Sequence, residues 1–311
     1  DVSVSLAALS ALWEISVNAE YCVPLVREHG AAAAVLTAAQ RHPDNVEVVC
    51  AACGTLRNLA VPSDARTLLL RDDSIANAVV EALQQFGSDA EVARVGCWAL
   101  RNLAGVNNGR TLLARDDSGS AAVVAALKQH VDNASVAEAA LNALWNMTVG
   151  TTVLCERLLH TIGVMPPMLA ALRRHATNDD VARAACCVLR NLGANAPSLL
   201  VVEQAVVDAL VPALRAHGDD AKVAIAGCWA LYRIACVEAN RALVAPERSA
   251  GVVVGLLQKK MGNAAVVEAA CSALWALAEL RTVRTPALQA EGAGAAVLAA
   301  LRRHTHGDAF T

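Results

Sequence analysis

A short leucine-centred pattern recurs seven times along this chain of 311 residues. Its central leucines are Leu12, Leu56, Leu100, Leu144, Leu189, Leu231 and Leu274. The copies are spaced by about 44 residues, and a helical period of this size is typical of solenoids built from two- or three-helix units. Each unit of such a fold packs only on its neighbours. The period therefore predicts a stack of helices without a single central pocket, and it directs the search for function to an extended surface.

The composition suits such a stack and argues against several other classes. Hydrophobic residues make up 56% of the chain, above the usual share of about 45–50%, and a repeat that buries two faces can use this excess. The net charge of −3 argues against a general nucleic-acid binder, whose domain is usually basic. No apolar run reaches the ~18 residues that a membrane span requires, and the N-terminus lacks the pattern of a signal peptide.

Each leucine pattern lies in a long helical segment, which we call the third helix of its unit. Asp or Asn precedes it, as at Asp44-Asn45, Asp89, Asp132-Asn133, Asp179-Asp180, Asp219-Asp220 and Asn263. These side chains accept hydrogen bonds from the free N–H groups of a helix N-terminus. Upstream we predict a second helix, such as residues 75–86, and before it a short first helix, such as residues 63–71 or 107–115. Gly30, Gly163 and Gly292 mark the turn between the first and second helices.

The third-helix string Cys97-Trp98-Ala99-Leu100-Arg101-Asn102-Leu103-Ala104, together with three helices per unit, resembles the armadillo repeat over essentially the whole chain. The resemblance implies an all-α, right-handed α-solenoid of about seven three-helix repeats, the first and last incomplete. We predict one domain over residues 1–311, with units at approximately 1–17 (partial), 18–61, 62–105, 106–149, 150–193, 194–236, 237–280 and 281–311 (partial). Because both ends fall within a unit, we expect a longer parent protein with further repeats or other domains.

A helical wheel separates a core face of the third helices from an opposite face. Relative to the central leucine, offsets 0, +3, −4 and −7 are apolar in nearly every unit, whereas offsets −6, −2, +1 and +2 lie opposite. The resemblance implies that this opposite face lines a concave groove. The candidate peptide-binding residues are Asn58, Asn102, Asn146, Asn191 and Arg233 at +2, Arg57, Arg101, Trp145, Arg190 and Tyr232 at +1, and Trp98 and Trp229 at −2.

The asparagine run favours a peptide ligand, because a carboxamide can pair with the C=O and the N–H of a peptide together. Helices stacked about 8–10 Å apart would place one asparagine at every two to three residues of an extended chain, which advances about 3.3 Å per residue. The arginines could pair with Asp, Glu or phosphate, and the aromatic side chains could hold aliphatic stems. The alternative is structural: asparagines that bond to neighbouring backbone, arginines on a solvated face and tryptophans that pack repeats together.

Residues that carry catalytic or metal chemistry form no matching pattern. Five cysteines share offset −3, where a small buried residue is expected; they are Cys53, Cys97, Cys186, Cys228 and Cys271. Cys50 and Cys53 form one C-x-x-C without a second pair, which favours a plain helix over a zinc site. The helix dipole is enough to explain the histidines at the ends of second helices, because a cation is favoured at a helix C-terminus. Phosphate-binding, dinucleotide-binding and hydrolase motifs are missing, so we predict no enzyme activity, no metal and no cofactor.

These observations predict a protein-protein interaction scaffold that binds extended segments of other proteins, acidic segments among them, in a groove lined by third helices. Two alternatives stay open: a regulatory armadillo segment of a larger multidomain enzyme, and an importin-α-like nuclear import receptor, for which only Trp98 with Asn102 supplies the paired residues. We expect a monomer without a nucleic-acid partner, and a cytoplasmic or nuclear location because the cysteines suit a reducing compartment. Replacing Asn102 and Asn146 by Ala is expected to weaken binding with little change in Tm.

Overall fold

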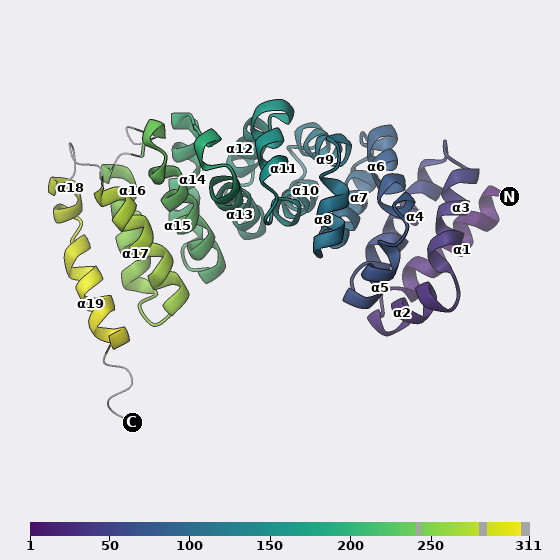
Figure 1. Cartoon of the computed structure of the whole chain (residues 1–311), viewed down its shortest axis with the longest axis horizontal. Helices are drawn as coiled ribbons and strands as arrows, with labels where there is room; N and C mark the ends of the chain where they lie inside the picture. The colour runs from purple at the N-terminus through teal and green to yellow at the C-terminus, as the bar shows by residue number, and fades with distance from the viewer. Residues whose placement is uncertain (241–242, 245, 280–284, 306–311) are drawn as a thin grey trace, which may run out of the picture. The chain divides into compact units, whose positions relative to one another are not determined.

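The computed structural model describes residues 1–240, 243–244, 246–279 and 285–305, and in this part every regular element is a helix (Figure 1). The contacts divide the chain into two compact units, Asp1–Ala171 and Leu172–Thr311, with the division inside one helix. Within the first unit, third helices pack in chain order, α1 on α4, α4 on α7 and α7 on α10; within the second, α13 packs on α15 and α15 on α17. The predicted all-α class is confirmed, whereas the superhelical hand and the repeat boundaries stay predictions.

The third helices begin at the residues that the capping pattern predicts. They are α1 (Val2–Ile15), α4 (Val46–Leu59), α7 (Ala90–Leu103), α10 (Ala134–Met147), α13 (Asp179–Asn195), α15 (Ala221–Cys236) and α17 (Ala264–Ala278). The Asp89 carboxylate, for example, accepts hydrogen bonds of 2.9 Å from the N–H groups of Glu91 and Val92. Two helices differ: Asp1 caps α1, for which the sequence pattern predicted no cap, and Asn178 caps α13. The expected pair Asp179-Asp180 lies in its first turn, where negative charge suits the helix dipole.

The second helices and most first helices also follow the prediction. The second helices are α3 (Ala31–Arg41), α6 (Ser74–Phe86), α9 (Ser118–Gln129), α12 (Met165–Arg174), α14 (Gln204–His217), α16 (Pro246–Lys259) and α19 (Ala293–Thr305). The first helices are α2 (Ala19–Arg27), α5 (Ser63–Leu69), α8 (Asn107–Leu113), α11 (Thr152–Arg157), which a π-turn at Leu158–Ile162 extends, and α18 (Thr285–Ala290). Gly30, Gly163 and Gly292 adopt left-handed φ angles of 60°, 73° and 69°, as the turn before a second helix requires.

Two units of the second half depart from the three-helix pattern. Single 3₁₀ turns at Pro197–Leu199 and Glu238–Asn240 stand where first helices were expected. Asn240 is fully buried, donates hydrogen bonds to the carbonyl oxygens of Leu200 and Ile234, and accepts one from the N–H of Val202. This one side chain therefore satisfies main-chain groups of the loop at Leu200 and Val202 together with a carbonyl oxygen in the last turn of α15.

Polar side chains join successive repeats outside the apolar core. The ring Nε2 of His130 lies 2.7 Å from the carbonyl oxygen of Gly87, and His217 makes the same contact with Ala176. Arg115 pairs with Asp73 of the preceding repeat. The histidines at the ends of second helices thus do more than interact with a helix dipole, because they bond to the turn of the repeat before them.

Candidate functional site

Within each unit, the side chains expected opposite the core lie on one side of that unit's third helices, and we call this side the third-helix surface of the unit. In the first unit it comprises Arg57, Arg94, Trp98, Arg101 and Trp145, all partly exposed. In the second unit it comprises Arg190, Trp229, Tyr232, Arg233 and Trp275, of which Trp275 is 55% exposed. The central leucines from Leu56 to Leu274 are buried, and Leu12 is partly exposed. The wheel therefore assigned the core face correctly, whereas the opposite face is only partly open, because offset +2 is buried at Asn58, Asn102, Asn191 and Ala276.

The asparagines lie beneath this surface and tie third helices together. The Asn102 amide donates to the carbonyl oxygen of Arg57 over 2.8 Å, and the Asn58 amide donates to that of Trp13 over 3.1 Å. The accepting carbonyls belong to the last turn of their helices, where no intrahelical donor remains. Asn58 is 8% exposed and Asn102 is 5% exposed. These two amides face the preceding helix instead of solvent, which agrees with the structural alternative for them.

The other two asparagines give a mixed result. Asn146 is partly exposed and donates to the carbonyl oxygen of Arg101 over 2.8 Å, so it continues the same ladder. Asn191 is buried, and its Oδ1 accepts a hydrogen bond of 3.3 Å from Arg190. A peptide contact through Asn146 or Asn191 stays a prediction.

The arginines of the first unit form a charged cluster across α4 and α7. Arg94 makes a two-point ion pair with Glu91, and this hydrogen bonding lowers the pKa of Glu91. Burial and the nearby Arg94 charge lower the pKa of Arg57. Arg101 donates to Asn102 Oδ1 over 2.9 Å, and its guanidinium lies 5.6 Å from the centre of the Trp98 ring. The cluster therefore places positive charge at the surface, and Arg101 in addition holds the side chain of Asn102 in place through its hydrogen bond.

The second unit carries an aromatic cluster on the same side of its third helices. The ring centres of Trp229 and Tyr232 are 5.4 Å apart and nearly perpendicular, and Tyr232 lies 6.0 Å from Trp275. The Arg233 guanidinium lies 5.2 Å from the Tyr232 ring. The Arg233 stem rests against Gly193, where an added Cβ would stand 2.5 Å from the Cβ of Arg233. An exposed tryptophan opposite the core offers contact area for a partner.

A hollow at the start of this surface was missed by the sequence analysis. It has a volume of about 320 Å³ and lies between α1, α4 and the beginning of α7. Its lining residues are Leu6, Ser10, Trp13, Val46, Glu47, Cys50, Ala51, Asp89 and Glu91. The available signal was the pair Leu6 and Cys50, two apolar residues at offset −6 on a face predicted to be open.

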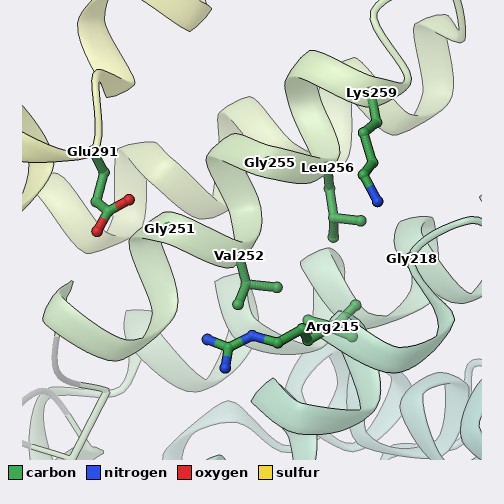
Figure 2. A pocket seen from close by; sticks show the side chains of 9 residues that line it. Arg215, Gly218, Gly251, Val252, Gly255, Leu256, Lys259 and Glu291 are labelled. Carbon is green, nitrogen blue, oxygen red and sulfur yellow. The ribbon is translucent and has the colours of Figure 1, made fainter.

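A second hollow of about 320 Å³ lies on the second-helix side of the second unit, between α14 and α16 (Figure 2). Gly251 and Gly255 stand one turn apart on α16, and a Cβ added at Gly255 would meet nothing within 4 Å. Arg215, Lys259 and Glu291 surround the opening. Lys259 is 65% exposed at its side chain and lies 3.5 Å from Asp219. The missing side chain at Gly255 contributes open space to this hollow, whereas at Gly251 an added Cβ would stand 2.8 Å from the Glu291 carboxylate.

Neither a cluster of metal-ligating side chains nor a membrane-spanning helix is found among the described residues. They contain no group of three or more His, Cys, Asp or Glu side chains arranged to hold a metal ion. None of their helices combines the length and apolar character that crossing a membrane requires. Burial raises the pKa of Cys50 to about 11 and that of Cys53 to about 12, so their thiolates form less readily than that of an exposed cysteine.

Comparison with known proteins gives one family match. A family model described as the LRRK2 ARM repeat matches residues 4–200. The matched region runs from α1 to the 3₁₀ turn after α13, and so includes the ladder of asparagines and the arginine cluster. A search of curated proteins found no significant match.

Proposed function

Because the chain belongs to the LRRK2 ARM repeat family, we propose that it is a non-catalytic, regulatory segment of a larger multidomain protein. It acts by holding another protein segment, in extended form, on its third-helix surface. The family match carries this proposal: LRRK2 is a large multidomain kinase in which ARM repeats form one region, and ARM repeats typically mediate protein interactions. The regulatory reading, an alternative from the sequence, thereby becomes the leading one.

The chemistry of the third-helix surface supports protein binding. Arginine and aromatic side chains are enriched in protein interfaces, and both lie here in a partly exposed state. Within the part of the chain that the structure describes, Arg57 makes no ion pair, so its guanidinium is open to a carboxylate of a partner. Trp275 supplies an exposed ring that an aliphatic side chain of the partner would cover.

The importin-like alternative has less support from the geometry. A lysine that entered between Trp98 and Asn102 would meet the Arg101 guanidinium over the Trp98 ring. The Asn102 amide is engaged with the carbonyl oxygen of Arg57. Like charges at this distance repel each other, so the surface suits acidic segments near Arg57 better than basic ones.

Peptide selection against the whole chain tests the proposal. We expect a display library of extended peptides to yield binders whose affinity falls about tenfold, or ~1.4 kcal/mol, with Arg57→Glu or Trp275→Ala, as measured by calorimetry. Arg41→Glu is the matched control, because Arg41 is exposed on the second helix α3. Binders that are insensitive to both surface variants, or as sensitive to Arg41→Glu, would contradict a role for the third-helix surface.

A further inference from the structure

The hollow between α1 and α4 owes its shape to one close approach. A Cβ added at Gly54 would stand 2.5–2.7 Å from the Trp13 ring atoms Cε2, Cδ2 and Cζ2. The indole of Trp13 can therefore lie on the backbone of α4, where it forms one wall of the hollow. A larger residue at position 54 would push this wall away, because neither the ring nor the helix backbone can yield cheaply.

Two further lining residues are apolar at a position that is mostly charged in the other third helices. Leu6 and Cys50 occupy offset −6, which holds Arg94, Glu138, Arg183 and Glu268 in later third helices and an apolar residue again at Ile225. Leu6, Trp13 and Cys50 are all partly exposed. Apolar side chains that remain open to water in a concave site favour an apolar occupant.

The rim of the hollow is acidic. Asp89 caps α7 and Glu91 pairs with Arg94, whereas Glu47 is exposed and makes no ion pair within the described residues. Burial, then the carboxylates of Glu91 and Asp89, raise the pKa of Cys50, and the Arg94 charge opposes them, so negative charge outweighs positive charge at this thiol. A cation beside an apolar side chain complements such a site, and Lys or Arg can lay its stem along apolar surface.

We infer that this hollow is an anchor pocket for one large apolar side chain of a partner segment, with a Lys or Arg next to it facing Glu47. Its volume of about 320 Å³ is near the lower end for ligand sites, and suits one Leu, Met or Phe with adjoining backbone. The inference rests on the proposed function, because it places a bound segment across α1 and α4. It adds that the segment is basic and apolar at this end, in contrast to the arginine cluster.

A set of three blocked peptides tests the anchor pocket with the whole chain. The probes share glycine ends around Lys-Leu-Lys, Lys-Ser-Lys or Glu-Leu-Glu, and binding is followed by NMR titration. We expect Lys-Leu-Lys to bind about tenfold more tightly than either of the others, because loss of the buried leucine or reversal of the charges removes a large part of the affinity. Equal binding of Lys-Leu-Lys and Lys-Ser-Lys, or no binding of Lys-Leu-Lys, would overturn the inference.

Two variants locate the binding. Ser10 is exposed and lines the hollow, so Ser10→Phe should fill it and abolish the preference for leucine. Glu47→Gln removes the unpaired carboxylate and should weaken Lys-Leu-Lys about two- to fivefold, the range for a surface ion pair. Glu28→Gln, at the exposed C-cap of α2, should change nothing. If circular dichroism shows that Ser10→Phe fails to fold, Glu47→Gln still tests whether the peptide binds in the hollow, and unchanged affinity for Lys-Leu-Lys would overturn the inference.

The outcomes separate this inference from the proposed function. Peptides selected against the whole chain that depend on Arg57, yet bind Ser10→Phe and Glu47→Gln normally, would leave the proposed function standing and overturn the anchor pocket. Sedimentation can also reveal whether the chain self-associates. Self-association that Ser10→Phe abolishes would identify a second copy of this chain as the occupant of the hollow, and it would overturn the anchor pocket for a partner segment.

Discussion

The side-chain amide of Asn102 donates a hydrogen bond to the main-chain carbonyl oxygen of Arg57, with Nδ2 and the oxygen 2.8 Å apart. Asn102 lies in α7, and Arg57 lies in the last turn of α4, so the bond joins neighbouring repeats. Asn146 repeats it with Arg101. One residue type at a fixed position thus supplies the donor that the end of the preceding helix lacks.

Replacing Asn102 by Ala should therefore lower the free energy of unfolding by about 1–3 kcal/mol, because a buried amide is removed and the part-buried carbonyl oxygen of Arg57 loses its donor. Urea denaturation followed by circular dichroism measures this. The matched control is Asn77→Ala, on the exposed side of α6, which should stay within about 0.5 kcal/mol of the unaltered chain. The sequence alone led us to expect little change in Tm for the asparagine variants, and an unchanged stability for Asn102→Ala would favour that earlier reading.

Because Gly54 and Trp13 are in close contact, the effect of Gly54→Ala on stability should change sign when Trp13 is replaced by Ala. In the unaltered chain, Gly54→Ala should destabilise, since overpacking typically costs about 1–3 kcal/mol and exceeds the gain of up to about 1 kcal/mol from better helix propensity. When Trp13 is first replaced by Ala, the clash disappears and the same Gly54→Ala change should stabilise. A double-mutant cycle by denaturant unfolding measures this coupling. Equal effects in both backgrounds would contradict the close approach.

His217 should matter more for stability than its position at a helix end suggests. It is 7% exposed, its Nε2 lies 2.7 Å from the Ala176 carbonyl oxygen, and its Nδ1 pairs with Asp179. His217→Ala should cost about 1–3 kcal/mol, because it removes a buried side chain together with its bond to the Ala176 carbonyl oxygen and its pairing with Asp179, as measured by thermal and urea unfolding. His160→Ala, on an exposed turn, serves as the control and should have almost no effect.

Alkaline pH should weaken the fold through buried thiols. Burial raises the pKa of Cys53, Cys97 and Cys228 to about 12, against an ordinary value of 9.0. Since the folded pKa is raised, the unfolded chain releases these protons first. The stabilisation is complete below pH 9 and is lost as the pH rises from about 9 towards 12. Between about pH 8 and 10.5, stability of Cys97→Ala should fall less steeply than that of the unaltered chain; parallel slopes would contradict the assignment.

The elements that the sequence predicted well are those with local causes. Asp89 caps α7 because its side chain reaches N–H groups two and three residues away, and Leu100 is buried because apolar residues recur on its side of the same helix. Before α14 and α16, where the three-helix pattern predicted a short first helix, the described residues contain a 3₁₀ turn. There, Asn240 bonds to residues up to 40 positions away, which no local pattern reveals.

The candidate site divides in the same way. Sequence correctly placed Arg57, Trp98 and Tyr232 on the face opposite the core. It left open whether Asn58 and Asn102 faced a ligand or the neighbouring helix. The hollow beside Trp13 was missed, because it depends on an indole meeting a glycine in the next repeat.

Taken alone, the sequence determined the helical class, the period, the caps and the buried face, since spacing along one helix sets each of these. Only the tertiary structure decided whether each side chain opposite the core faces solvent or bonds to the neighbouring helix. Whether an asparagine meets water or a carbonyl depends on the approach of two helices, and that approach is set by side chains a whole repeat apart, such as Gly54 under Trp13.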